Sequence, residues 1–406
     1  MATMQNVDDY LAEILAAIRP LTPRELSLED ADGGVLAEDI TAQWPLPPFD
    51  NSAMDGYAVC AADLAAATAE HPVTLPVTGE VAAGDTREHQ VAPGSCLRIM
   101  TGAPMPAGAD AVVPVELTDG GIAQVAIRQA ARPGDSVRRA GGDAAPGDAL
   151  LAAGIRLGPA ALGLLAASGR ASVLARPRPR MTVLSTGNEL AAPGTPVTRG
   201  QIWESNSFML ASAARQAGAV AARQASVPDD PAKVLAVIED AAGRADLLVT
   251  SGGVSMGGEH DVVKAALEKL GTVGFRKVAM QPGMPQGFGM VGAASTPIMT
   301  LPGNPVSAYV SFQLFVRPAL RALQGKASGH QRTARAVLTA PLRSPRDKRS
   351  FLRGVLADDG TEVTPLSGQA SHQLAALARA NALIVVPEQV VAMQEGDVAE
   401  VICLDD

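Results

Sequence analysis

Apolar residues near the start of the chain recur with the period of an α-helix. Six of them lie three or four positions apart and so share one face of a helix: Val7, Tyr10, Leu11, Ile14, Leu15 and Ile18. Asn6 is suited to cap the first turn, and Pro20 ends the pattern. The sequence therefore predicts an amphipathic helix whose apolar face packs against another part of the protein.

The pattern then changes to short runs typical of strands. The segment WPLPPF, 44–49, is held extended by its prolines and leads into residues 51–59. Between Val73 and Leu150 the runs VTLPVTGEV, CLRIMTGAP, DAVVPVEL and IAQVAIRQ are separated by Gly, Pro and Asp, which predicts a small mainly-β domain. A helix is expected over 159–168, and the proline-spaced basic segment RPRPR, 176–180, marks a boundary.

Apolar strands alternate with amphipathic helices in the second half of the chain. The predicted strands are Thr182–Ser185, Ala222–Val227, Leu247–Thr250, Val273–Met280 and Pro297–Leu301, and the predicted helices are Ser207–Ala217, Pro231–Ala242, Val262–Leu270 and Val306–Ala322. This order is typical of a doubly wound α/β domain with a mostly parallel sheet. From about Ser328 onward short strands return, as in RAVLTAPL and ALIVVP, and predict a C-terminal β domain.

Charge and composition exclude several classes of protein. The 406 residues include 33 Lys and Arg against 42 Asp and Glu, so the formal net charge is −9; proteins that bind nucleic acid or anionic membranes usually need a basic patch. No apolar run reaches the roughly 18–20 residues of a membrane-spanning helix, and Met1–Asn6 lacks the basic start of a secretory signal. Cys60, Cys96 and Cys403 are too scattered for a disulfide framework or a zinc site. We therefore expect a soluble cytoplasmic protein.

Three loops rich in Gly and hydroxyl residues follow strands of the α/β segment. They are STGNEL (185–190), TSGGVSMGGEHD (250–261) and LPGNPVS (301–307). Ligands of an open parallel sheet bind beyond the carboxyl ends of its strands, where Gly lets the backbone approach them. One such loop often serves only as a tight turn, but three favour a shared binding crevice. GxxxxGK[ST] follows none of these strands, which argues against a P-loop nucleotidase, and no GxGxxG opens the α/β segment.

Carboxylates stand in Gly-rich loops and not on solvated helix faces. They are Asp55, Asp143, Glu189, Asp229, Asp230 and Asp261. Oxygen ligands without Cys or clustered His favour a hard cation such as Mg²⁺, although each residue could instead serve in a turn or a helix cap. Hydroxyl and cationic groups suited to phosphate occur at Thr101, Arg138, Arg139, Lys277, Arg353 and Ser371. Because no HExxH occurs and no pairing of Cys with His indicates a nucleophile, we expect metal-assisted positioning of the substrate and not covalent catalysis.

Six stretches in order along the chain carry a resemblance to a known family. They are PPFDNSAMDGYA (47–58), LRIMTGAPMPAGADAVVPVE (97–116), RRAGGD (138–143), STGNEL (185–190), SGGVSMGGEHD (251–261) and LPGNPVSAYVSF (301–312). Together they resemble the MoeA molybdopterin molybdenumtransferases, the family to which the E domain of gephyrin also belongs. STG or SGG alone would not be specific, whereas the six stretches span nearly the whole chain.

The resemblance implies a multi-domain α/β plus β fold. Its parts would be a helical and extended N-terminal domain (1–43 with 145–176), an inserted mainly-β domain (44–144), a doubly wound molybdopterin-binding α/β domain (177–327) and a C-terminal β barrel (328–406). It also implies a homodimer whose active site lies between the α/β domain of one subunit and the inserted domain of the other. Transient contacts with molybdopterin adenylyltransferase and with acceptor molybdoenzymes would follow.

The implied reaction is the Mg²⁺-dependent hydrolysis of adenylylated molybdopterin, with insertion of molybdate and release of AMP. By motif position, catalytic roles fall on Asp55, Asp143, Glu189, Asp229, Asp261 and Lys277, and the metal ligands would be Glu189, Asp229 and Asp261. Substrate binding falls on Thr101, Pro302, Pro305, Arg353 and Ser371, to which the strand-end loops add Ser185, Gly187, Ser251, Gly252, Gly253, Gly303 and Asn304. Two assignments leave an alternative open: the functional residue could be Asp230 instead of Asp229, and Arg349 instead of Arg353.

One stretch departs from the family pattern. Many members have KPGKP after the fourth strand, whereas this chain has QPGMP at 281–285, so Gln281 and Met284 stand at two cationic positions. The loss of two charges is expected to weaken the field that attracts an oxyanion, and it leaves open whether the oxyanion is molybdate or tungstate. The alternatives are a paralogue that handles another oxyanion, the preceding adenylyltransferase, and a molybdopterin-binding scaffold with weak catalysis. A scaffold would not need the carboxylates, and an adenylyltransferase would not need the first 150 residues.

Overall fold

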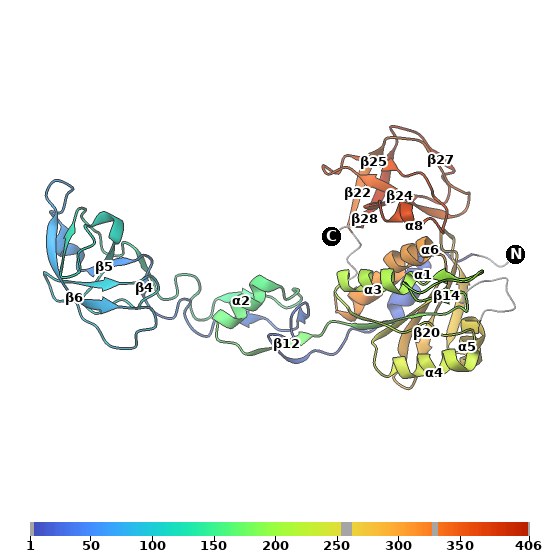
Figure 1. Ribbon diagram of the computed structural model, residues 1–406, viewed down its shortest axis with the longest axis horizontal. Coiled ribbons are helices and arrows are strands. Elements are labelled where there is room, and N and C mark those ends of the chain that lie inside the picture. Colours follow the sequence, from blue (N-terminus) through green and yellow to red (C-terminus); the bar gives the residue numbers. More distant parts are fainter. Residues whose placement is uncertain (1–3, 253–261, 327–331, 405–406) are drawn as a thin grey trace. The chain divides into compact units, whose positions relative to one another are not determined.

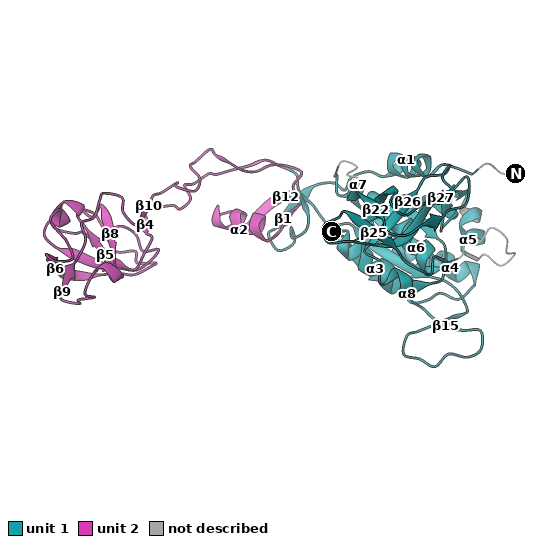
Figure 2. Ribbon diagram, turned by 90° about the horizontal axis from the view of Figure 1, so that it is seen from above, with its two compact units in different colours: residues 1–37, 174–406 teal, residues 38–173 magenta. Residues whose placement is uncertain are grey.

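The chain folds into two compact units. The computed structural model describes residues 4–252, 262–326 and 332–404 (Figure 1). One unit is formed by residues 38–173, and the other by residues 1–37 and 174–406 (Figure 2). None of the described helices is long and apolar enough to cross a membrane.

A six-stranded sheet forms the centre of the larger unit. Its strands, in spatial order, are β16 (Val220–Arg223), β13 (Arg180–Ser185), β17 (Leu247–Ser251), β21 (Thr296–Leu301), β20 (Pro285–Val291) and β18 (Val273–Lys277). The first four are parallel, as predicted, while β20 is antiparallel to both of its neighbours. Strand β20 is not predicted by its sequence, because the run PQGFGMV carries two glycines and a proline, which are depleted in strands. Strand β18 therefore runs in the direction of the parallel strands.

Helices cover both faces of this sheet. They are α3 (Asn206–Gln216), α4 (Pro231–Ala242), α5 (Val262–Leu270), α6 (Pro305–Ser311), the π-helical turn η3 (Phe312–Val316) and α7 (Arg317–Leu323). Leu248 belongs to the core under α4 and α5, and Val249 belongs to the core under α3, α6 and α7. Successive strand side chains point to opposite faces, so the strand β17 is buried on both sides. The long helix predicted over 306–322 is interrupted by η3, just before Pro318, which lacks a backbone N–H.

The predicted N-terminal helix is confirmed as α1 (Val7–Ala17). The side chain of Asn6 caps it by accepting the backbone N–H of Asp8 at 2.7 Å. Tyr10 is buried and packs edge-on against Phe315 with ring centroids 4.9 Å apart. The helix therefore belongs to the core of the larger unit, whereas the expected N-terminal domain joined it to residues 145–176. The four domain boundaries stay a prediction.

The C-terminal residues form a closed β barrel. Its strands are β22 (Thr333–Leu338), β24 (Arg349–Leu356), β25 (Glu362–Pro365), β26 (Ala382–Val386) and β28 (Val398–Cys403). Pairing of β24 with β26 closes the ring. The short strand β19 (Met280–Gln281) adds to β24, so the QPGMP stretch begins on the barrel. The C-terminal part also contains an antiparallel two-stranded ladder of β23 (Leu342–Arg343) and β27 (Ala392–Met393) and the single turn α8 (Leu374–Leu377).

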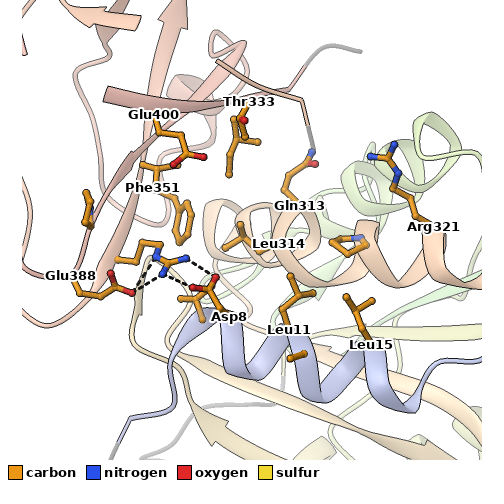
Figure 3. A pocket seen from close by; sticks show the side chains of 17 residues that line it. Asp8, Leu11, Leu15, Gln313, Leu314, Arg321, Thr333, Phe351, Glu388 and Glu400 are labelled. Carbon is orange, nitrogen blue, oxygen red and sulfur yellow. Dashed lines mark hydrogen bonds and ion pairs between the residues drawn. The ribbon is translucent and has the colours of Figure 1, made fainter. Parts of the chain in front are cut away.

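Helix α1, the η3–α7 segment and the barrel enclose a cavity of about 620 Å³ (Figure 3). Arg349, on β24, forms ion pairs with Asp8 of α1 at 2.8 Å and with Glu388 at 3.0 Å. Leu11 and Phe351 form part of the apolar lining. The guanidinium of Arg349 thus fastens the barrel to α1.

The smaller unit is mainly β, in agreement with the alternating pattern of its sequence. Its five-stranded sheet has the order β8 (Ala111–Pro114), β5 (Gly56–Val59), β7 (Cys96–Ile99), β6 (Val73–Val81) and β9 (Gln124–Ile127). Two shorter ladders pair β10 (Val137–Arg138) with β4 (Asn51–Ser52), and β11 (Ala149–Leu151) with β3 (Ile40–Thr41). The predicted helix is α2 (Pro159–Ala167). It is followed by β12 (Ser172–Arg176), which leads the chain back into the larger unit and pairs there with β1 (Arg24–Ser27) and β2 (Val35–Leu36).

Candidate functional site

The three Gly-rich loops lie together at the carboxyl edge of the parallel strands. The backbone N–H of Gly252 donates to the carbonyl of Leu301 at 3.1 Å, and Thr186 donates to the carbonyl of Ser251 at 3.4 Å. A Cβ on Gly252 would lie 3.0 Å from the carbonyl oxygen of Thr186, and one on Gly303 would lie 3.6 Å from the Cα of Gly252. The loops are therefore packed backbone against backbone, as expected if they line one shared binding crevice.

Adding a methyl group at Gly252 should be costly, whereas adding one at Gly303 should be tolerated. Gly252 has φ +94° and its Cβ would press on a backbone oxygen, while the Cβ of Gly303 would make an ordinary van der Waals contact. We expect Gly252→Ala to lower the free energy of unfolding by about 1–2 kcal/mol, and Gly303→Ala to change it by less than about 0.5 kcal/mol. Equal losses in chemical denaturation of the two variants would contradict this packing.

The loop after β13 carries Ser185, Gly187 and Glu189. Ser185 is buried and its Oγ donates to Glu204 Oε1 at 2.9 Å. Gly187 has φ +148°, and the carboxylate of Glu189 folds back over the position that a Cβ at Gly187 would occupy. Only glycine fits there without displacing the carboxylate. The carboxylate of Glu189 therefore lies over the loop backbone at Gly187.

The two neighbouring acids Asp229 and Asp230 have different roles. Asp229 Oδ2 accepts the backbone N–H of Asn188 at 3.1 Å, and Asn188 Oδ1 accepts the backbone N–H of Asp229 at the same distance. Asp230 instead caps α4, and the backbone N–H groups of Lys233 and Ala232 lower the pKa of its carboxyl group. The geometry thus favours Asp229, which lies beside the loop that carries Glu189.

A second part of the site joins α6 to the barrel. Asn304 Nδ2 donates to Ser371 Oγ at 3.0 Å, and the backbone N–H of Val306 donates to the carbonyl of Ser371 at 3.0 Å. Pro302 and Pro305 flank the turn between β21 and α6. The loop after β25 is therefore bound to the loop after β21.

Arg353, on β24, is fully buried behind this loop. Its Nη2 donates to the carbonyls of Gly368 and Ala370, while its Nε and Nη1 have no partner among the described residues. Burial lowers the pKa of its guanidinium. A buried guanidinium with unused donors is suited to an oxyanion. Arg349 is committed to its ion pairs with Asp8 and Glu388, so the geometry favours Arg353 over Arg349.

Lys277 ends β18 at the same edge of the sheet as the three loops, because β18 runs parallel to β21. Its carbonyl accepts the backbone N–H of Gln5 at 2.8 Å. The following QPGMP stretch turns back, and the backbone N–H of Val278 donates to the carbonyl of Met284 at 2.8 Å. Gln281 is exposed, so its amide is open to solvent.

The smaller unit holds the other predicted residues, Asp55, Thr101 and Asp143. Asp55 Oδ1 accepts the backbone N–H of Thr101 at 2.6 Å and its hydroxyl at 2.8 Å. These hydrogen bonds, the backbone one foremost, hold the pKa of the Asp55 carboxyl below its usual range. Asp143 is exposed, and its backbone N–H donates to the carbonyl of Leu46 at 2.8 Å. Thr101 thus stabilises the ionised form of the Asp55 carboxyl.

Thr101→Val should raise the pKa of Asp55 part of the way toward its usual value, because the backbone hydrogen bond remains and the hydroxyl is lost. In the native protein the pKa of Asp55 is depressed, so the ionised carboxyl favours folding above its unfolded pKa and loses this effect as the pH falls through its folded pKa. A titration of the Asp55 carboxyl carbon by NMR measures the change. An identical titration curve in Thr101→Val would exclude the hydroxyl as a cause.

Models of known families match nearly the whole chain. The MoeA N-terminal region, domains I and II, matches residues 5–169, a probable molybdopterin binding domain matches 182–322, and the MoeA C-terminal region, domain IV, matches 335–404. The chain is 50% identical over 402 residues to molybdopterin molybdenumtransferase 2 of Mycobacterium tuberculosis, with 98% of each chain covered. The chain belongs to the MoeA family of molybdopterin molybdenumtransferases.

Other MoeA relatives agree in sequence and fold. The molybdopterin molybdenumtransferase of Bacillus subtilis is 36% identical over 386 residues, which are 93% of this chain and 89% of the relative. A solved MoeA structure from Pyrococcus horikoshii has a TM-score of 0.75 at 32% identity and covers all of both chains. A second has a TM-score of 0.73 at 26% identity, covering 99% of this chain and 100% of the other. The resemblance and the fold class inferred from the sequence are confirmed.

Two of the predicted MoeA site residues, Gly253 and Asp261, lie outside the described residues. Within the described ranges, His, Cys, Asp and Glu do not gather in groups of three or more that could hold a metal ion. Two residues that the sequence did not predict, Glu204 and Asn206, contact the loops: Glu204 contacts Ser185, and Asn206 contacts Ser251 and Gly303. Their only sequence signal is the polar run ESNS at the start of a helix, which is typical of an ordinary helix cap.

Proposed function

We propose that this MoeA protein hydrolyses adenylylated molybdopterin, inserts molybdate into it and releases AMP. The observation that carries the proposal is the buried guanidinium of Arg353, whose Nε and Nη1 have no partner among the described residues. These two donors lie behind the loop at 368–371, whose Ser371 binds Asn304. Two relatives, 50% and 36% identical to this chain, are named for molybdenum transfer. An oxyanion site beside loops suited to phosphate is what insertion requires.

The residues around Arg353 suit an oxyanion in two further ways. Ser371 Oγ accepts a hydrogen bond from Asn304, which leaves the hydroxyl hydrogen of Ser371 to donate. Arg353 is fully buried, where a charge is screened less than at the surface. We propose that Arg353 compensates for the uncharged Gln281 and Met284, so that molybdate is bound without the two lysines of other members.

Glu189 and Asp229 fit a magnesium ion. Mg²⁺ usually takes one or two protein carboxylates together with water and substrate phosphates, and the two acids lie on adjoining loops joined through Asn188. Mg²⁺ held there would neutralise phosphate charge and polarise the phosphoryl group. Asn188 orients the Asp229 carboxylate, and Gly187 leaves room for Glu189 to fold back over the loop.

We propose a homodimer in which the α/β domain of one subunit and the smaller unit of its partner complete the active site. Its support is that Asp55, Thr101 and Asp143 belong to a unit separate from the loops. Molybdopterin adenylyltransferase and acceptor molybdoenzymes would bind it transiently. Cys60, Cys96 and Cys403 form no disulfide bonds in the described part of the chain, which suits a reducing cytoplasm.

The proposed function is tested with purified protein, adenylylated molybdopterin, Mg²⁺ and either molybdate or tungstate. We expect AMP release that depends on the oxyanion and stops when Mg²⁺ is chelated. Release that depends on tungstate alone would assign a different oxyanion. Adenylylation of molybdopterin by ATP would indicate the preceding enzyme, and binding without any AMP release would indicate a scaffold.

A further inference from the structure

The segment between β15 (Ile202–Trp203) and α3 contributes a buried carboxylate to the site. Glu204 is 7% exposed. Its Oε1 accepts Ser185 Oγ at 2.9 Å and the backbone N–H of Ser207 at 2.7 Å, while Oε2 accepts Ser207 Oγ at 2.6 Å. Glu204 therefore joins the end of β13 to the first turn of α3.

Asn206, the first residue of α3, joins the other two loops. Its Nδ2 donates to Ser251 Oγ at 2.7 Å, at the end of β17, and to the carbonyl of Gly303 at 2.6 Å, after β21. Both amide hydrogens are used in these bonds. Its Oδ1 is buried and has no partner among the described residues. One side chain thus spans two strand ends that are far apart in sequence.

The same segment also fixes the backbone around Glu189. Strand β15 pairs in parallel with β14 (Leu190–Ala191). The N–H of Ile202 donates to the carbonyl of Glu189 at 2.8 Å, and the N–H of Glu204 donates to the carbonyl of Ala191 at 2.9 Å. The three loops, one of which carries Glu189 of the proposed metal site, are therefore linked through five consecutive residues, 202–206.

We propose that Asn206 and Glu204 are positioning residues that hold the three loops in the arrangement that binds the phosphate-bearing substrate. This inference rests on the proposed function. Backbone and hydroxyl dipoles stabilise a charged ligand best when they are oriented before it binds. Asn206 and Glu204 act through Ser185, Ser251 and Gly303 and do not touch the substrate themselves, so their removal should weaken binding more than it slows the chemical step.

Asn206→Asp tests the inference with little change of shape. The aspartate keeps the size of the side chain but loses both donated hydrogens and presents a carboxylate to the carbonyl of Gly303. We expect the Kd and KM of adenylylated molybdopterin to rise roughly tenfold, with a smaller change in kcat. Glu204→Gln should act in the same direction, because its amide nitrogen cannot accept a hydrogen bond from Ser207.

Ser205→Ala is the matched control. Ser205 lies between the two positioning residues and its side chain makes no capping hydrogen bond, so the Kd of the substrate should stay unchanged. The fraction of protein able to bind and the melting temperature are measured for every variant. A merely structural role would lower these two quantities and leave the Kd of the remaining protein unaltered, and that result in both Asn206→Asp and Glu204→Gln would overturn the inference.

Binding is measured separately from AMP release, so that two failures can be told apart. Wild-type protein that binds adenylylated molybdopterin but releases no AMP with molybdate would contradict the proposed function, and the Kd values of the variants would still decide the role of Asn206. Wild-type protein that binds no adenylylated molybdopterin would overturn both. Wild-type activity together with an unchanged Kd in Asn206→Asp would overturn the positioning role alone.

Discussion

Replacing Arg353 with methionine should sharply lower AMP release at limiting molybdate without unfolding the protein. The guanidinium of Arg353 has two unused donors, and each charge-assisted hydrogen bond to an oxyanion contributes about 1.5–3 kcal/mol. Loss of both corresponds to a rise in the KM of molybdate of roughly 100-fold or more. Methionine fills the space of the alkyl stem and removes a buried charge, which offsets the lost hydrogen bonds to Gly368 and Ala370.

The matched control is Arg349→Met, four residues earlier on the same strand. Arg349 pairs with Asp8 and with Glu388, whose side chain is 18% exposed. We expect this variant to lose about 1–2 kcal/mol of unfolding free energy and to keep the KM of molybdate. Denaturant unfolding and molybdate saturation curves should therefore distinguish the two variants. Arg349→Met should lower the free energy of unfolding, and Arg353→Met should raise the KM of molybdate. If Arg349→Met raises the KM and Arg353→Met does not, the assignment of the oxyanion site is reversed.

Asp229→Asn should lower AMP release by roughly 10–100-fold at limiting Mg²⁺. Asparagine has the shape of aspartate, and its Oδ1 can still accept the backbone N–H of Asn188, so the loop contact persists. What disappears is one negative charge beside Glu189. The expected signature is a higher Mg²⁺ concentration for half-maximal AMP release, and raising Mg²⁺ should restore part of the activity.

Asp230→Asn is the control for this second prediction. Asparagine caps helices about as well as aspartate, so α4 should keep its N-terminal hydrogen bonds to Ala232 and Lys233. Activity and Mg²⁺ dependence should match those of the wild type. A Mg²⁺ requirement that shifts in Asp230→Asn and stays constant in Asp229→Asn would show that the cap, and not its neighbour, holds the metal.

The sequence predicted the elements of this protein better than it predicted their contacts. Helix α1, with its Asn6 cap, and helix α4 follow from local periodicity and start signals, because both are properties of neighbouring residues. The antiparallel strand β20 could not be predicted, because its glycines and proline are atypical of strands. The strands that pair with β20 stabilise it despite that weak local preference, and this pairing is a property of the fold and not of the local sequence.

The choice between Arg349 and Arg353 shows why the site could not be completed from the sequence. The two residues are four apart on β24, so the alternation of a strand puts both on the same face and cannot tell them apart. They differ in what covers them: α1 lies over Arg349, and the loop at 368–371 lies over Arg353. Asn206 is similar, since its partners are 45 and 97 positions away.

Through strand β24 the barrel contributes a residue to the proposed site, although the barrel lies far from the strand-end loops in the sequence. One end of the strand anchors the barrel to α1 through Arg349, and four residues later it supplies Arg353 to the proposed oxyanion site. An α/β domain cut free of the barrel would keep the strand-end loops that follow β13, β17 and β21, but it would lack the guanidinium and Ser371. Separating the two domains would therefore separate recognition of the organic substrate from capture of the metal oxyanion.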